Sequence, residues 1–78
     1  MASHSFTLEV SGINPENPRF EDALFKAGCD DALIAVVDDR LYLDFDREAA
    51  SFDLAVASAT KDVSSAGGKV IHIEPIKD

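Results

Sequence analysis

The chain is poor in cysteine and in basic residues, and each shortage argues against a class of protein. Of its 78 residues one is cysteine, Cys29, and none is tryptophan. A single thiol forms no internal disulfide, so nothing in the sequence requires an oxidising compartment. Seven lysines and arginines stand against 15 aspartates and glutamates, which gives a formal net charge of −8. That balance disfavours direct binding of nucleic acid through its phosphates.

Long hydrophobic segments are also missing. The longest apolar run, 32–37, has six residues, whereas a membrane-spanning helix needs roughly 20. The first residues, 1–5, lack the basic stretch followed by an apolar run that marks a signal peptide. We therefore expect a cytoplasmic protein without membrane contact.

Four β-rich segments are present. Apolar and polar residues alternate over 6–10 and over 41–46, which predicts strands with one buried face. The apolar run 32–37 and the segment 69–74, which Pro75 ends, predict two more strands. The short polar connection 38–40 joins two of these strands as a hairpin.

Two helices are expected between the strands. Apolar residues at helical spacing predict a first helix with Asn17 as its N-cap and Pro18 at its first position, ended by Gly28. Ser51 is the expected N-cap of a second helix, which Gly67 and the glycine after it end.

The resulting order, β-α-β-β-α-β, is that of the ferredoxin-like fold, in which two crossovers interleave. We predict one α+β domain over 1–78, with a four-stranded antiparallel sheet in the order 4-1-3-2 and both helices on one face. The predicted core consists of Phe6, Leu8, Val10, Phe20, Leu24, Leu33, Leu41, Leu43, Phe45, Phe52, Val56, Val63, Ile71 and Ile73.

The other sheet face is predicted to stay uncovered, and its residues are candidates for function. By alternation they are Thr7, Glu9, Ile34, Val36, Tyr42, Asp44, Asp46, Val70 and His72. RNA-binding members of this architecture place aromatic and basic side chains on the middle strands. Here Tyr42 stands with aspartates, which disfavours RNA binding.

Catalytic and metal chemistry find little support in the residue pattern. The loop 12–18 contains neither a cysteine pair for thiolate metal transfer nor a basic residue for an anion cradle. We interpret Cys29 as a small hydrophobic residue rather than a nucleophile, and His4 and His72 as incidental. No calcium-binding loop is recognisable. We therefore expect a protein that is not an enzyme, with no catalytic residues, metal ligands or cofactor.

Acidic residues are concentrated around the predicted hairpin. Eight of the 15 acids lie between positions 30 and 53, where Arg40 and Arg47 alone oppose them. Such carboxylates can imitate a phosphate track and engage a basic groove built for nucleic acid. Solubility alone is the simpler interpretation of an acidic surface. The candidate partner-binding residues are Asp30, Asp31, Asp38, Asp39, Tyr42, Asp44, Asp46, Glu48 and Asp53, with Ile34 and Val36 as further apolar anchors.

Three segments resemble a known bacterial domain. They are 23–32 (ALFKAGCDDA), 43–49 (LDFDREA) and 70–75 (VIHIEP). They are similar to the N-terminal domain of bacterial proteins that continue into an excisionase-like helix-turn-helix. The chain ends at Asp78, where that family begins its DNA-reading helices, so the resemblance does not carry DNA binding over. The chain is then either a fragment of such a regulator or a small protein that uses the fold for another purpose.

In size, charge and predicted fold the chain also resembles small phage-encoded anti-CRISPR inhibitors. Our functional hypothesis is a monomeric, acidic inhibitor that acts as a DNA mimic. It would bind a basic nucleic-acid-binding groove of a protein partner, such as a subunit of a CRISPR effector complex. The alternative is a regulatory or dimerisation domain of a helix-turn-helix transcriptional regulator, which would self-associate through the open face or a sheet edge.

Overall fold

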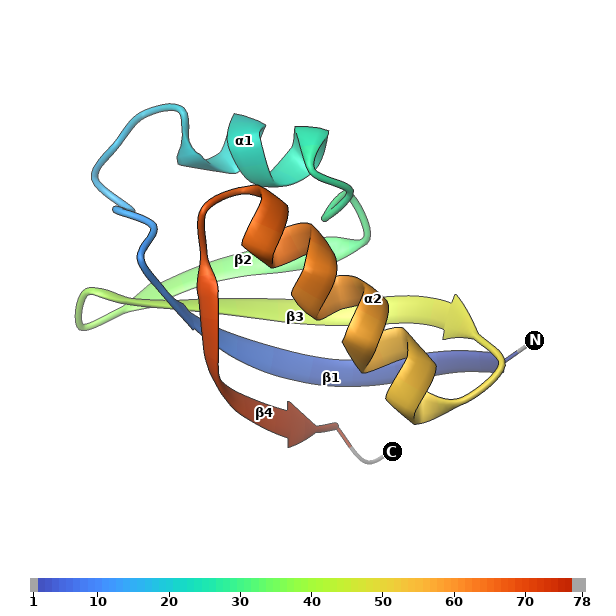
Figure 1. The fold of residues 1–78 in the computed structure, drawn as a ribbon. Helices are drawn as coiled ribbons and strands as arrows, with labels where there is room; N and C mark the ends of the chain where they lie inside the picture. The colour runs from blue at the N-terminus through green and yellow to red at the C-terminus, as the bar shows by residue number, and fades with distance from the viewer. Residues whose placement is uncertain (1, 77–78) are drawn as a thin grey trace.

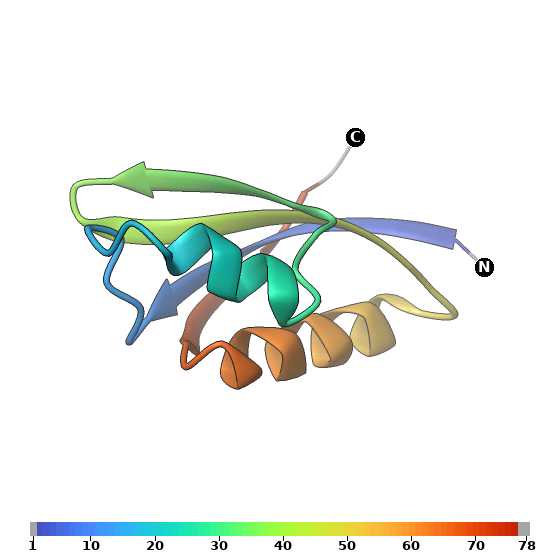
Figure 2. The same cartoon turned by 90° about the horizontal axis from the view of Figure 1, so that it is seen from above.

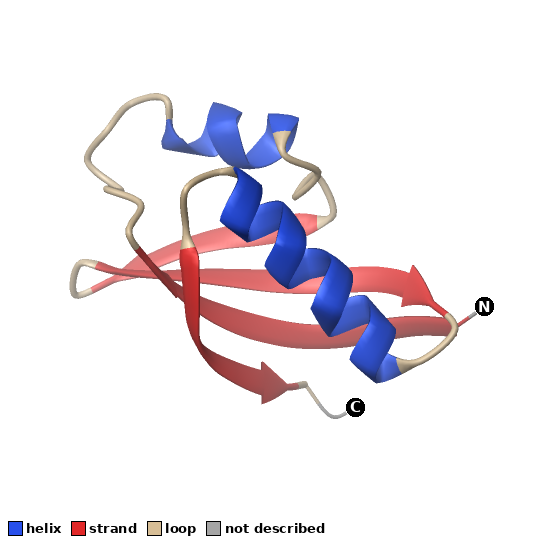
Figure 3. Ribbon diagram, viewed as in Figure 1, coloured by secondary structure: helices blue, strands red, loops and turns tan. Residues whose placement is uncertain are grey.

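A computed structural model describes residues 2–76 and contains the six predicted elements in the predicted order (Figure 1). The strands are β1 (Ala2–Ser11), β2 (Ala32–Val37), β3 (Arg40–Ala49) and β4 (Lys69–Pro75), and the helices are α1 (Phe20–Lys26) and α2 (Phe52–Ser65). Figure 3 shows that each helix connects two strands, whereas a tight loop joins β2 directly to β3.

All neighbouring strands are antiparallel, and the sheet has the order β2-β3-β1-β4. Both helices lie against the same face of this sheet, as the view in Figure 2 makes plain. The arrangement is ferredoxin-like, so the predicted fold class and strand order are confirmed. The long central strands β1 and β3 pair from Ala2 opposite Ala49 to Val10 opposite Leu41. They form the platform on which the other elements are placed.

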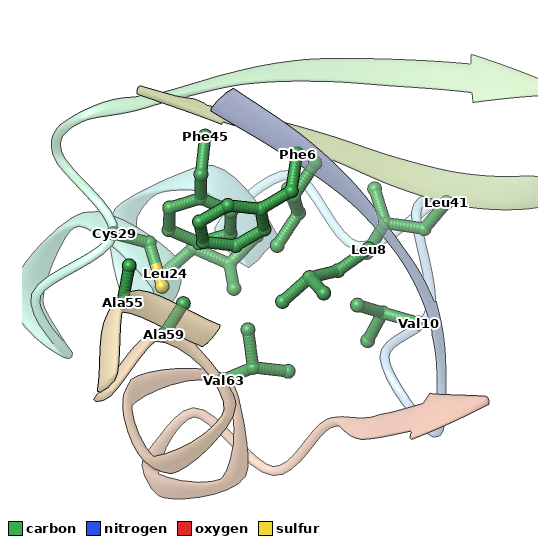
Figure 4. Close-up of a cluster of buried hydrophobic side chains, with 11 residues drawn as sticks. Phe6, Leu8, Val10, Leu24, Cys29, Leu41, Phe45, Ala55, Ala59 and Val63 are labelled. Carbon is green, nitrogen blue, oxygen red and sulfur yellow. The ribbon is translucent and has the colours of Figure 1, made fainter. Parts of the chain in front are cut away.

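The core lies between the two central strands and the helices (Figure 4). Phe6 of β1 stacks on Phe45 of β3, with ring centroids 5.4 Å apart, and Phe52 meets Phe6 edge-on. Small residues of α2, Ala55 and Ala59, are fully buried, so this helix can approach the sheet closely. The buried core is Phe6, Leu8, Val10, Leu24, Cys29, Leu41, Leu43, Phe45, Ala55, Ala59 and Val63.

The ends of α2 agree with the prediction, whereas α1 begins later than predicted. Ser51 Oγ accepts a hydrogen bond from the Leu54 N–H at 3.2 Å and so caps α2. Asn17 Oδ1 accepts a hydrogen bond from the Arg19 N–H at 3.0 Å, but its carbonyl also closes a tight turn with the Phe20 N–H. This turn takes up Asn17 and Pro18, so the helix starts at Phe20.

The two faces of β2 are the reverse of the predicted ones. Residues directly opposite each other in an antiparallel pair share a face. Ile34 pairs with buried Leu43, and Val36 pairs with buried Leu41, so both belong to the helix-covered face. Leu33, predicted in the core, pairs with Asp44 on the uncovered face and is 76% exposed. A continuous apolar run has no alternation, so it does not reveal which residues face the core.

The last strand also departs from the predicted pattern. Val70 pairs with Val10 and packs against the core, whereas we expected it on the uncovered face. The register of β4 shifts at a bulge between Glu9 and Val10 of its neighbour, which makes Ile71 an extra residue. Ile71 and Ile73, both predicted in the core, are 53% and 43% exposed. β4 is an edge strand with no further strand beside it, so these side chains remain only half covered although α2 contacts the strand.

Candidate interaction surface

The sheet face opposite the helices is uncovered (Figure 2), and we call it the open face. Asp44, Asp46 and Glu48 alternate along β3 with residues of the other face, Phe45 and Arg47, and therefore share the open face. Successive carboxylates on this strand are about 6.7 Å apart along the chain direction. The row of three acids runs along one of the two central strands.

Acids of the neighbouring strands extend this row. Glu9 of β1 lies opposite Tyr42 of β3, and His72 of β4 lies opposite Glu9 on its other side. Glu74 lies opposite Thr7, two residues further along β4. The register thus places five carboxylates on the open face, contributed by three adjacent strands. They belong to Glu9, Asp44, Asp46, Glu48 and Glu74.

Glu9 and Glu74 are not among the candidate binding residues taken from the sequence. Glu74 lies outside the acidic segment 30–53. Glu9 is predicted on the open face by alternation but is not one of the nine candidate binding residues. Strand order and the two-residue alternation together identify both residues. They place Glu9 of β1 beside the acids of β3, and Glu74 on β4, the next strand beyond β1. Linear clustering of charge alone overlooks acids that the sheet brings together.

One acid of the open face is held in place by a cross-strand contact. The Thr7 hydroxyl donates a hydrogen bond to Asp44 Oδ1 at 2.7 Å, and the two residues lie directly opposite each other. Tyr42 is half-buried among its neighbours, whereas Asp46 and Glu48 are exposed. The open face therefore offers one fixed carboxylate beside two that are free to turn toward a partner.

Asp38 and Asp39 lie beyond the open face, at the tip of the β2–β3 hairpin. Both are exposed and have positive φ, 51° and 65°. Positive φ at both central residues is the requirement of a two-residue type I′ turn, and aspartate tolerates it better than most residues. The turn therefore accounts for these residue types, and it also projects two carboxylates from the end of the sheet.

Asp31 is engaged by Arg47 on the helix side of the sheet. Arg47 Nε and Nη2 donate to the two carboxylate oxygens of Asp31, each at 2.8 Å. The same guanidinium donates to Asp62 at 2.9 Å and to the Gly28 carbonyl at 2.8 Å, and it lies over the Phe45 ring. Hydrogen bonding to Arg47 lowers the pKa of Asp31 below its ordinary value of 3.8. Arg47 of β3 thus links the residue before β2 to α2, and the charge of Asp31 is compensated.

The remaining candidates, Asp30 and Asp53, do not join the open face. Asp53 is in the first turn of α2, which lies on the opposite side of the sheet. Its negative charge there interacts favourably with the positive end of the helix dipole. Asp30 is exposed in the loop between α1 and β2. Of the nine candidate residues, the structure brings together Tyr42, Asp44, Asp46 and Glu48 on the open face and Asp38 and Asp39 at its end.

Cys29, His4 and His72 lie in separate parts of the structure and do not form a common site. Cys29 is 4% exposed within the core, as its interpretation as a small hydrophobic residue predicts, and burial raises the pKa of its thiol to about 11. His4 alternates with core residues on the helix side and meets the Phe52 ring edge-on. His72 is on the open face, 3.8 Å from Glu74 Oε2. Pairing of β1 with β4 does not bring the two histidines together, because they lie on opposite faces.

Neither helix within residues 2–76 has the length and apolarity needed to cross a membrane. The same residues enclose no pocket and gather no group of three or more metal-ligating side chains. No known protein family, curated protein or solved structure matches the chain. The ferredoxin-like fold and the acidic open face are therefore the features on which a functional argument rests.

Proposed function

We propose that this protein is a small acidic inhibitor that binds, as a DNA mimic, to a basic nucleic-acid-binding surface of a partner protein. The observation that carries this proposal is the gathering of five carboxylates on one uncovered sheet face, from three adjacent strands. The partner class that we favour is a CRISPR effector complex, whose DNA channel is lined by positive charge. Such a target places the inhibitor in the cytoplasm, acting without catalysis.

Charge distribution around the open face supports this function. The sheet register places two basic residues on the open face near these acids, Arg40 at the start of β3 and Lys69, opposite Ser11, at the start of β4. Arg47 instead points to the helix side and is already bonded to Asp31 and Asp62. Unlike Asp31, the open-face acids of β3 are therefore not compensated by an arginine bridge. A face on which acidic side chains outnumber basic ones attracts a positively charged surface over several ångströms and accelerates encounter.

Affinity requires apolar contact in addition to charge. Exposed ion pairs are worth only about 0.2–1 kcal/mol each, so carboxylates mainly supply rate and selectivity. Tyr42 lies at one end of the acidic row, next to Asp44 on the open face and opposite Glu9. Leu33, opposite Asp44, is 76% exposed. Tyr42 therefore remains a candidate anchor, whereas Leu33 replaces Ile34 and Val36, which belong to the other face. An aromatic anchor with an apolar neighbour is typical of the energetic centre of an interface.

The test is a competition between this protein and target DNA for a guide-loaded CRISPR effector complex, measured by fluorescence anisotropy of labelled DNA. The wild-type protein is expected to displace DNA, with weaker inhibition as salt rises. Asp44→Lys combined with Asp46→Lys should weaken inhibition roughly 10-fold or more. The free energy of unfolding should fall by only about 1 kcal/mol, from loss of the Thr7–Asp44 hydrogen bond, because Asp46 is exposed and the helix-side core is untouched.

The matched control is Glu16→Lys combined with Glu21→Lys, which changes the net charge by the same amount. Both residues are exposed in or just before α1, away from the open face. This variant should inhibit nearly as well as the wild type. Equal loss in both variants would show an effect of total charge, and full inhibition by the Asp44/Asp46 variant would remove the proposal.

A further inference from the structure

The two edges of the sheet differ in how they resist pairing with another strand. Edge strands expose unpaired backbone groups, and proteins protect them with bulges, proline and charged residues. The β4 edge has all three, since Ile71 is a bulge residue, Lys69 begins the strand and Pro75 ends it. The β2 edge has none of them: Ala32–Val37 contains only alanine, leucine, isoleucine and valine, and its register with β3 is unbroken.

The outward backbone groups of β2 follow from its pairing. The Asp31 carbonyl accepts a hydrogen bond from the Asp46 N–H of β3 at 3.2 Å. Alternate residues of an antiparallel strand turn their N–H and C=O groups to opposite sides. The groups of Ile34 and Val36 therefore point away from β3, toward the outer edge of the sheet. A strand placed there would find two donors and two acceptors in line.

Side chains along this edge are apolar and exposed on both faces. Leu33 and Val37 are 76% and 54% exposed on the open face, and Val36 is 47% exposed on the helix side. Exposed aliphatic side chains on both faces are what an added strand would cover with its own alternating side chains. The exposed apolar side chains and the outward backbone groups together make this edge suited to pairing with an added strand.

Charge at both ends of β2 selects the occupant. Asp30 precedes the strand, and Asp38 and Asp39 follow it, all exposed. A second copy of this chain, with net charge −8, would bring acid against acid whether the two strands ran parallel or antiparallel. A segment with lysine or arginine on each side of an apolar stretch would instead pair its charges at both ends in either direction.

We propose that the β2 edge binds an extended segment of a partner protein, apolar in its middle and basic at both ends, as an added strand of the sheet. This inference needs only the edge of the sheet and is independent of the DNA-mimic function of the open face. Backbone hydrogen bonds would supply affinity, and the acids at each end would set specificity.

The probe is a synthetic peptide of alternating valine and threonine with two lysines at each end, titrated into the isotopically labelled protein. We expect shifts in the amide spectrum concentrated on 32–37 and slowed hydrogen exchange at Ile34 and Val36. Two N-methylated peptides, each blocking one set of alternate amides, test strand addition directly. The peptide methylated on the side facing β2 should bind about 10-fold or more weakly, and the other should bind like its parent.

A protein variant gives a second test. Val36→Pro removes an outward N–H, and Val36→Thr keeps it with similar shape. The proline variant should lose the peptide while the threonine variant binds it, with both folded by circular dichroism. Equal binding of both N-methylated peptides would overturn the proposal, as would shifts confined to the open face. Two results would overturn the proposal that a basic-flanked segment is the occupant. One is equal binding of a glutamate-flanked peptide, and the other is a dimer of the wild-type chain that becomes monomeric in the Val36→Pro variant.

Discussion

The Thr7 hydroxyl donates a hydrogen bond to Asp44 Oδ1 at 2.7 Å, between the two central strands. This contact holds one carboxylate of the open face in a fixed orientation, next to Glu9 on the same strand as Thr7. It stabilises a charge that repulsion from neighbouring acids would otherwise displace. The fold therefore supports part of its acidic face with a hydroxyl donor instead of a positive charge.

Replacing Thr7 by valine removes the donor and keeps the β-branched shape. We expect Thr7→Val to lower the free energy of unfolding by about 1 kcal/mol, as for a part-buried hydrogen bond. Urea unfolding followed by circular dichroism measures it. Ser5→Ala, on the same strand opposite Asp46, is the control and should stay within about 0.5 kcal/mol of the wild type. Equal effects would mean that the Thr7 contact contributes nothing.

Arg47 is the residue whose loss should damage the fold most. Its side chain is only 12% exposed and bridges Asp31 and Asp62. Arg47→Gln leaves two partly buried carboxylates without their cation, so we expect a loss of about 3 kcal/mol in the free energy of unfolding. Arg40→Gln, which changes an exposed arginine on the same strand, should cost less than about 0.5 kcal/mol. A comparable effect of the two variants contradicts a structural role for the Arg47 cluster.

The same cluster predicts a contribution to acid sensitivity. Hydrogen bonding to Arg47 lowers the folded-state pKa of Asp31, so Asp31 stabilises the folded chain fully above its unfolded pKa of about 4. That stabilisation is lost as the pH falls through the lowered folded pKa. The difference in free energy of unfolding between the wild type and Asp31→Asn should therefore shrink from pH 5 to pH 3. A difference that stays constant over this range would contradict the argument.

Alanine substitutions at two glycines with positive φ, Gly67 and Gly28, distinguish the cost of backbone strain from the cost of steric crowding. Gly67, with φ of 91°, has no atom within 4 Å of an added Cβ, so Gly67→Ala should cost about 1 kcal/mol from conformation alone. At Gly28, with φ of 109°, a Cβ would lie 2.8 Å from Asp62 Oδ2, which Arg47 holds in place. Gly28→Ala should be clearly more destabilising in thermal unfolding. Equal costs would mean that the Asp62 carboxylate moves without penalty.

The sequence predicts the fold well because its strongest signals are local. Alternation in β1 and β3 identifies which residues face the core, and the Ser51 cap with Gly67 beyond the helix marks both ends of α2. The β2 strand is different, since an unbroken apolar run looks the same on either face. Its orientation follows from the pairing of Leu33 with Asp44, which only the assembled sheet reveals.

The composition of the acidic surface depends on contacts between distant segments. Asp31 and Asp62 are 31 positions apart in the chain, yet both bind Arg47, and this removes Asp31 from the charge available to a partner. Glu74 joins the open face only because β4 pairs with β1. Counting charges along the chain finds the acidic hairpin, but it does not distinguish compensated acids from free ones.

The account depends most on the open face being the surface that attracts positive charge, and a decalysine peptide tests this without a known partner. Titrated into the isotopically labelled protein at low salt, the peptide should shift the amides of Thr7, Tyr42, Asp44 and Asp46 most. Asp44→Lys combined with Asp46→Lys should abolish those shifts while the spectrum stays dispersed. Shifts spread evenly over the acids of both helices, or unchanged in the variant, would contradict the account.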